Sequence, residues 1–242
     1  YRSHSFPTRR SSDLSMRRDF ISNLSHELRT PVSVIRANSE TLIDGALDDK
    51  KQAKIFAKAI LHNAERLTDM VASLLDLTRI EYGELKLNFE EINLDSFIKN
   101  YIQSVANLSK KKEIDIVYKP QHEGTVNADL QAIERIMNNL IDNAIKYSEN
   151  GSEIIISTAN ESDNYIKVMV KDTGEGISDE DKNHIFSRFY RTASARATDN
   201  QGSGLGLAIV KHLANNLNGE VGIESKTHEG SIFWFTLPSY HR

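Results

Sequence analysis

The chain carries the string Ser25-His26-Glu27-Leu28-Arg29-Thr30-Pro31 within a long stretch of helical periodicity. At roughly 100° per residue, an apolar stripe runs along one side of the expected helix, and His26 lies almost opposite to it. The members of the stripe are Phe20, Leu24, Leu28, Pro31, Ile35 and Leu42. The imidazole is therefore expected to face water, where most histidines are no more than solvated side chains.

The neighbours of His26 give it a chemical context. Glu27 can accept the proton on one ring nitrogen, which leaves a lone pair on the other nitrogen for nucleophilic attack. Thr30 lies one turn further along the same face, where it is either part of the site or a solvated hydroxyl. Pro31 cannot donate to the carbonyl of Glu27, so we expect a bend beside the ring, which could equally be an ordinary kink.

A second helical pattern follows at spacings that alternate between four and three residues: Phe56, Ile60, Asn63, Leu67, Met70, Leu74 and Leu77. A repeat of 3.5 residues is typical of the seam of a helical bundle. Between the two patterns, Gly45 is suited to the end of one helix, and Asp48 and Asp49 to the start of the next. We expect a helical hairpin that dimerises into a four-helix bundle. The alternative is that both seams pack on the C-terminal part of the same chain.

The pattern changes after Glu81-Tyr82-Gly83-Glu84. Further helices are expected over residues 94–110, 130–147 and 205–217. An apolar alternation spans residues 86–89, and strands are expected over residues 114–118, 153–159, 165–171, 221–224 and 231–237. This order predicts an α+β layer with helices on one face of a mixed sheet. The expected domains are 15–82 and 83–242.

Three later motifs point to a nucleotide site. Asp172-Thr173-Gly174-Glu175-Gly176 directly follows a strand, and its glycines would let the backbone approach a ligand closely or make only a turn. Gly202-Ser203-Gly204-Leu205-Gly206-Leu207 opens a helix whose free N–H groups favour phosphate, although alone it could be a flexible loop. The segment 139–147 places Asn139, Asn143 and Lys146 near one helix face, which could also be a hydrated surface.

The His26 string resembles the phosphoacceptor box of bacterial sensor histidine kinases. The three later motifs, with Phe186 and Phe189-Tyr190-Arg191 between the glycine runs, resemble the ATP-binding Bergerat fold of these kinases and of some ATPases. The resemblance runs from about Met16 to Pro238, and segment 40–47 is most similar to the phosphate-regulon type of sensor. It implies an α/β-sandwich ATP-binding domain after the dimerisation and phosphotransfer domain.

The resemblance also implies roles for individual residues. His26 would be the phosphoacceptor, Glu27 the base, and Thr30 the residue that orients water in a phosphatase reaction. Asp172 would accept from the adenine amine, Asn143 would bind Mg²⁺ through its side-chain oxygen, and the phosphates of ATP would contact Asn139, Lys146 and Arg191. Tyr147 would pack near adenine, Gly174 and Gly176 would border it, and the hinge and phosphate cradle would comprise Gly202, Gly204, Leu205 and Gly206. Residues 191–201 would form a mobile lid.

Three functions compete: a histidine kinase, an ATP-hydrolysing enzyme on the same fold, and a scaffold that only dimerises and binds nucleotide. ATPases of this fold activate water with a glutamate one turn before the magnesium asparagine, and here that position is Asn139. An amide cannot take up a proton at neutral pH. The sequence thus favours a histidine kinase that phosphorylates His26 from Mg-ATP. Such a kinase would pass the phosphoryl group to an aspartate in the receiver domain of a response regulator, and it would also dephosphorylate that regulator. A scaffold would lack one of the motifs, and none is missing.

Composition limits the partners and the location. Lys and Arg total 30 against 34 Asp and Glu, so we expect no nucleic-acid partner and no direct membrane contact from this fragment. The lack of cysteine excludes disulfides and thiolate metal sites. Residues 5–14 read like a translated sequencing adapter, so residues 1–14 are predicted to be an artefact, the alternative being a flexible polar tail. The fragment is expected in the cytoplasm, and a missing N-terminal part would anchor the full-length protein in the cell membrane.

Overall fold

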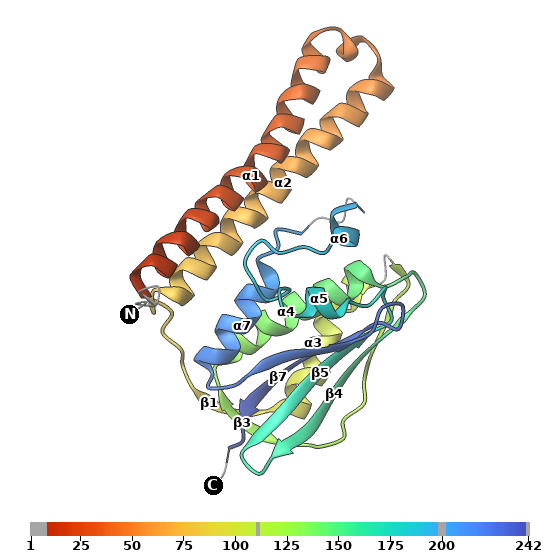
Figure 1. Cartoon of the computed structure of the whole chain (residues 1–242). Coiled ribbons are helices and arrows are strands. Elements are labelled where there is room, and N and C mark those ends of the chain that lie inside the picture. The colour runs from red at the N-terminus through yellow and green to blue at the C-terminus, as the bar shows by residue number, and fades with distance from the viewer. Residues whose placement is uncertain (1–8, 110–111, 198–201, 241–242) are drawn as a thin grey trace, which may run out of the picture. The chain divides into compact units, whose positions relative to one another are not determined.

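A computed structural model describes residues 9–109, 112–197 and 202–240 (Figure 1). The chain divides into two compact units, of which the first ends at Leu74 and the second begins at Leu75. The boundary expected between residues 82 and 83 lies just after the second long helix and stays a prediction. Helix α1 already includes residues 9–14. The rest of the proposed artefact, residues 1–8, lies outside the described residues. The adapter origin of residues 1–14 also stays a prediction.

The first unit is built on a helical hairpin. Helix α1 (Arg9–Ile43) and helix α2 (Lys50–Glu81) are joined by a short 3₁₀ turn, η1 (Ala46–Asp48), and run antiparallel in Figure 1. Gly45 adopts φ 128°, which a residue with a side chain rarely adopts. Asp49 accepts hydrogen bonds from the backbone N–H groups of Lys51 and Gln52, at 2.8 and 3.3 Å. The predicted break between the two helices is confirmed.

The hairpin leaves many apolar side chains in contact with solvent. Within the stripe of α1, Pro31 is buried and the other members are half-buried. Larger exposures occur elsewhere on the two helices, for example 77% at Ile43 and 65% at Ile55. Exposed apolar surface of this kind is typical of an association site. It supports the expected dimer, which stays a prediction.

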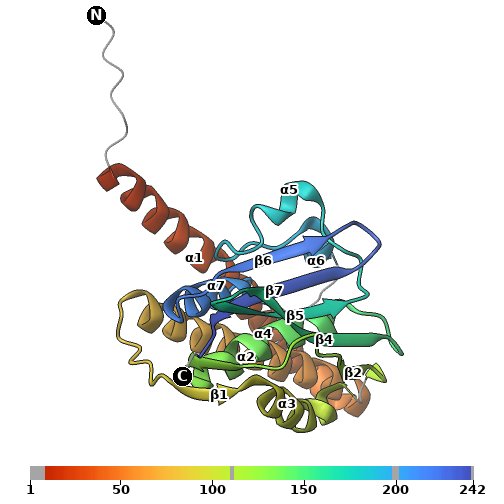
Figure 2. The same cartoon turned by 90° about the horizontal axis from the view of Figure 1, so that it is seen from below.

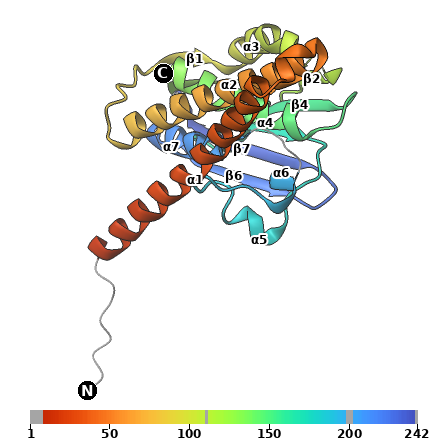
Figure 3. The same cartoon turned by 90° about the horizontal axis from the view of Figure 1, so that it is seen from above.

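The second unit contains a five-stranded sheet in the order β2-β4-β5-β7-β6 (Figure 2). Strand β2 pairs in parallel with β4, and the other neighbours are antiparallel. The strands are β2 (Asp115–Tyr118), β4 (Glu153–Ser162), β5 (Tyr165–Asp172), β6 (Val221–Ser225) and β7 (Ser231–Pro238). Helices α3 (Leu94–Ser109), α4 (Leu130–Tyr147) and α7 (Gly206–Asn216) lie on one side of this sheet (Figures 1 and 3). The predicted mixed sheet with helices on one face is confirmed.

The core of this unit follows from alternation in the strands. Ile166, Val168 and Val170 of β5 are buried, whereas the residues between them are half-buried. Helix α4 supplies the opposing apolar face, and its start is fixed by Asp129. One carboxylate oxygen of Asp129 accepts from the backbone N–H of Ala132 at 2.8 Å, as an N-cap does, and the other accepts from the N–H of Asn88 at 2.7 Å.

Some elements differ from the expectation. The apolar alternation over residues 86–89 precedes strand β1 (Glu90–Asn93), which was not predicted. Strand β3 (Thr125–Ala128), which pairs antiparallel with β1, was not predicted, and neither were the short helices α5 (Asp179–Lys182) and α6 (Ala193–Ala197). Strand β4 continues to Ser162, beyond the expected end at residue 159, whereas β5 begins at Tyr165 as expected. Within the described ranges, no helix has the length and apolar character needed to cross a membrane.

Candidate functional site

The first candidate site lies on α1. His26 is exposed, as its position opposite the apolar stripe predicts. Thr30 is also exposed, and its hydroxyl donates to the backbone carbonyl of His26 at 3.4 Å. This long bond leaves the hydroxyl at the surface, one helical turn from the imidazole. Helix α1 continues without a break across Pro31.

Glu27 faces the neighbouring helix. Its carboxylate lies 3.7 Å from the guanidinium of Arg66 on α2, and both side chains are partly buried. In the described part of the chain the structure records no hydrogen bond to the ring of His26, so the expected contact between Glu27 and His26 is not present in this conformation. The reason is geometric, because consecutive residues of a helix do not face each other. Sequence reasoning missed Arg66, for which the available signal was a basic residue beside the seam position Leu67.

The second candidate site lies at the end of β5. Asp172 is only 5% exposed, and its Oδ1 accepts from the backbone N–H groups of Gly174 at 2.9 Å and Ser231 at 3.2 Å. Burial raises the pKa of the Asp172 carboxyl, and these two hydrogen bonds partly offset that effect. Among the described residues, the structure records no donor to Oδ2 of Asp172. That oxygen is therefore suited to accept a hydrogen bond from a ligand.

Two glycines let the loop after β5 approach its neighbours. A Cβ atom placed on Gly174 would lie 2.6 Å from the backbone oxygen of Tyr147, at the end of α4. A Cβ atom on Gly176, whose φ is 70°, would lie 2.0 Å from the backbone oxygen of Lys226. Both contacts are closer than a side chain allows. The motif is therefore more than a turn, because its glycines bring three segments of backbone together.

Helix α4 meets the start of α7 through another glycine. A Cβ atom on Gly206 would lie 2.7 Å from Oδ1 of Asn139, whose amide nitrogen donates to the backbone oxygen of Arg135 at 2.8 Å. Around Gly202 the nearest atoms are Nζ of Lys146 and the hydroxyl of Tyr147, which a Cβ would meet at 3.9 and 4.0 Å. The structure thus brings together three segments that are far apart in the sequence. Burial raises the pKa of the Tyr147 hydroxyl, which keeps it neutral.

The remaining predicted site residues lie around the second glycine run. Gly204 has φ 67° and its carbonyl accepts from the N–H of Phe189 at 2.8 Å. The side chain of Leu205 is fully buried, so only its backbone can contribute to a site. The guanidinium of Arg191 donates to the carbonyl of Ala195 in α6. The rest of the expected lid, residues 198–201 including Gln201, lies outside the described residues.

The donor set bears on the expected magnesium. No group of three or more His, Asp or Glu side chains suited to a metal occurs in the ranges that the structure describes. Asn143 is half-buried and offers an amide oxygen on the same helix as Asn139 and Lys146. Mg²⁺ commonly takes most of its ligands from substrate phosphates and water, so a single protein oxygen fits it here.

Two family models match the chain. Residues 16–83 match the His Kinase A (phospho-acceptor) domain, and residues 128–241 match the histidine kinase-, DNA gyrase B- and HSP90-like ATPase. The sensor-like histidine kinase SenX3 of Mycobacterium tuberculosis is 38% identical over 92% of this chain and 54% of its own length. The sensor histidine kinase WalK of Bacillus subtilis is 34% identical over 92% of this chain and 36% of its own length. The chain thus spans about half or less of these relatives.

Solved structures agree with these matches. Histidine kinase ThkA in complex with response regulator protein TrrA has a TM-score of 0.77 and 26% identity, over 96% of this chain and 64% of that chain. Acinetobacter baumannii histidine kinase AdeS has a TM-score of 0.71 and 25% identity, over 89% of this chain and 98% of that chain. With a phosphoacceptor domain around His26 and an ATPase domain around Asp172, the chain belongs to the histidine kinases.

Proposed function

We propose that the chain is the catalytic core of a two-component sensor kinase that transfers the γ-phosphoryl group of Mg-ATP to His26. The observation that carries the proposal is the meeting of α4, the loop after β5 and the start of α7, where Gly174 and Gly206 approach Tyr147 and Asn139. Backbone N–H groups at the start of a helix favour phosphate oxygens. The site therefore suits a nucleotide with its phosphates toward α7.

Specific contacts suit this ligand. The buried carboxylate of Asp172 offers Oδ2 as an acceptor for the adenine amine. We assign Asn139, Lys146 and Arg191 to the phosphates, Tyr147, Gly174 and Gly176 to the surroundings of the base, and the phosphate cradle to Gly202, Gly204, Leu205 and Gly206. Asn143 would hold Mg²⁺, which neutralises phosphate charge when it is bound.

The choice of nucleophile follows from side-chain chemistry. Asn139 cannot act as a base toward water. The exposed His26 offers a ring nitrogen whose lone pair forms the bond to phosphorus while the bond from phosphorus to the bridging oxygen of ATP breaks, so ADP leaves with the electron pair. The ring proton then passes to a base, for which Glu27 must turn from Arg66. The protein mainly positions the two reactants and neutralises charge.

Onward transfer is the second part of the proposal. ThkA was solved in complex with the response regulator TrrA. By analogy, we propose that phosphorylated His26 passes its group to an aspartate of a receiver domain. Thr30, exposed one turn away, would orient water when the phosphoaspartate is hydrolysed. The exposed apolar side chains of α1 and α2 suit a homodimer, and membrane anchoring and the phosphate-regulon subtype remain proposals.

One experiment tests the central step. The protein is incubated with γ-labelled ATP and Mg²⁺, and the label on His26 should be acid-labile and stable in alkali. His26→Gln should abolish labelling and keep ADP affinity, because nucleophile and nucleotide site lie in different units. His62→Gln, the same change at an exposed position of α2, is the matched control. Labelling of His26→Gln at the wild-type level would refute the role of His26. The Thr30→Ala variant should be labelled at the normal level but should lose the ability to dephosphorylate a phosphorylated receiver domain.

A further inference from the structure

Three strands of the sheet end in one row of polar residues beside the proposed nucleotide site. Asp172 of β5 pairs with Ser231 of β7, and Ser231 pairs with Ser225 of β6. Directly opposed residues of neighbouring strands project to the same face of a sheet. The proposed adenine acceptor is therefore the first member of a row that ends at Ser225, a residue without an assigned role.

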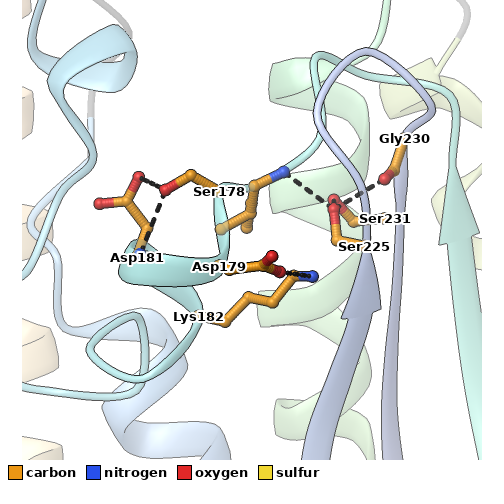
Figure 4. Close-up of polar contacts among 8 residues, drawn as sticks. Ser178, Asp179, Asp181, Lys182, Ser225, Gly230 and Ser231 are labelled. Atoms are coloured by element: carbon orange, nitrogen blue, oxygen red, sulfur yellow. Dashed lines mark hydrogen bonds and ion pairs between the residues drawn. The ribbon is translucent and has the colours of Figure 1, made fainter.

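The hydroxyl of Ser225 uses its full hydrogen-bonding capacity. It accepts from the backbone N–H of Ile177 at 2.8 Å. It also donates to the backbone carbonyl of Gly230 at 2.8 Å and lies 3.0 Å from the hydroxyl of Ser231 (Figure 4). A serine hydroxyl has one donor and two acceptor positions, so the three contacts occupy all of them. One side chain thus joins the loop after β5 to both strands of the β6–β7 hairpin.

The backbones on either side of this hydroxyl are in close contact. The Gly176 position has no room for a Cβ against Lys226, and a Cβ on Gly230 would lie 2.2 Å from the backbone oxygen of Asp172. The N–H of His228 donates to the carbonyl of Glu175 at 2.6 Å. The loop of residues 172–177 therefore lies directly on the hairpin. Small displacements of the hairpin must move the loop, since packed backbone has no space to absorb them.

The network also reaches the acceptor itself. The N–H of Ser231 donates to Oδ1 of Asp172, which leaves Oδ2 for a ligand. In the described ranges, the N–H of Ile177 has no acceptor other than Ser225. Loss of this bond would loosen the C-terminal end of the loop, which would then be held only by the bond from His228 to Glu175 and by the contact of Gly176 with Lys226.

We propose that Ser225 is a positioning residue that fixes the nucleotide-binding loop of residues 172–177 against the β6–β7 hairpin. The inference rests on the proposed function, because it assigns an adenine nucleotide to this loop. A loop that visits other conformations binds its ligand more weakly, because the apparent affinity is the intrinsic affinity multiplied by the fraction of molecules in the binding-competent conformation. Ser225 would thus act on affinity and base selectivity without touching the ligand.

The test is titration calorimetry of the full 242-residue protein with ADP and Mg²⁺, and separately with GDP and Mg²⁺. Ser225→Ala should bind ADP about 5- to 30-fold more weakly, as expected for the loss of one or two hydrogen bonds. The preference for ADP over GDP should fall, because the displaced loop is the part assigned to the base. Ser225→Thr, which restores a hydroxyl, should recover much of the affinity.

Thr236→Val is the matched control. The Thr236 hydroxyl accepts from the backbone N–H of Glu220 at 2.8 Å, the same kind of bond at the opposite end of the hairpin. This variant should lose stability and keep ADP affinity. If Ser225→Ala does not fold, Ser225→Cys, with a similar size and a weaker acceptor, takes its place.

The outcomes separate two failures. Wild-type affinity and selectivity in Ser225→Ala, or an equal loss of affinity in Thr236→Val, would overturn the positioning role. Failure of the wild type to bind ADP would refute the proposed function itself, and the role of Ser225 with it.

Discussion

Lys112 holds the end of the helix that carries the proposed phosphate-binding residues. Its ammonium donates to the backbone carbonyls of Ile145 at 2.8 Å, Lys146 at 3.0 Å and Ser148 at 3.3 Å. The last carbonyls of a helix have no partner within it, and the negative end of the helix dipole favours a cation. We predict that Lys112→Met, which keeps most of the aliphatic stem, destabilises the sheet unit and weakens ADP binding.

The magnitude follows from these contacts. The two shorter hydrogen bonds contribute about 1 kcal/mol each and the dipole about 0.5 kcal/mol, so the free energy of unfolding should fall by roughly 2–3 kcal/mol. If the free energy of unfolding falls by about 2 kcal/mol per molar urea, the midpoint of urea-induced unfolding should fall by about 1 M.

Fluorescence of Trp234 suits this measurement, because it is the only tryptophan of the chain and lies in β7. It follows the sheet unit alone, which matters since a chain of two units need not unfold in one step. Lys119→Met is the matched control, because Lys119 pairs with Glu153 at 2.8 Å while their side chains are 57% and 44% exposed. Such surface pairs contribute about 0–1 kcal/mol. Equal midpoints for the two variants would refute the proposed role of Lys112.

Two further predictions concern the nucleotide loop. Asp172→Asn should weaken ADP binding at least about tenfold, because the amide presents a donor to the adenine amine. Burial raises the pKa of Asp172 above 3.8, so the wild type should lose stability relative to Asp172→Asn as pH rises above that value, and urea titrations at two pH values check this sign. The left-handed backbone alone should cost an alanine at position 176 ~1–2 kcal/mol. Gly176→Ala should lower the free energy of unfolding by more than this and should also weaken ADP binding, because its Cβ meets the backbone of Lys226. Gly151→Ala, at φ 77° with no atom within 4 Å of the new Cβ, isolates the conformational cost; equal losses of stability and affinity in the two variants would contradict the steric argument.

Elements with a strong local signal were predicted from the sequence. Residues 130–147 form helix α4 as expected, since Asp129 provides its N-cap and the apolar positions repeat along one face. Strand β3 was missed because only two of its four residues are buried, and its pairing depends on β1 from a distant part of the chain. A strand this short has too few residues to show a period.

The candidate site could likewise be predicted only in part from the sequence. The exposure of His26 and the three nucleotide motifs could be predicted, because periodicity and glycine spacing are properties of short segments. Arg66, Lys112 and Ser225 could not, because each acts through a partner that is distant in the sequence, such as Glu27 for Arg66. A single serine or lysine in a strand or loop carries no pattern that separates it from a solvated side chain.

The position of Asp172 explains why so much of the structure supports one loop. A buried carboxylate is unfavourable unless it receives hydrogen bonds, and its two backbone donors come from the loop itself and from β7. Both of these donors bind Oδ1, so Oδ2 is the oxygen that can accept a hydrogen bond from a ligand. The close contacts at Gly176 and Gly230 and the bonds of Ser225 add to these two bonds in holding the loop that follows the buried carboxylate. Ligand binding should consequently raise the free energy of unfolding of the sheet unit, by an amount that the ligand concentration and its dissociation constant determine.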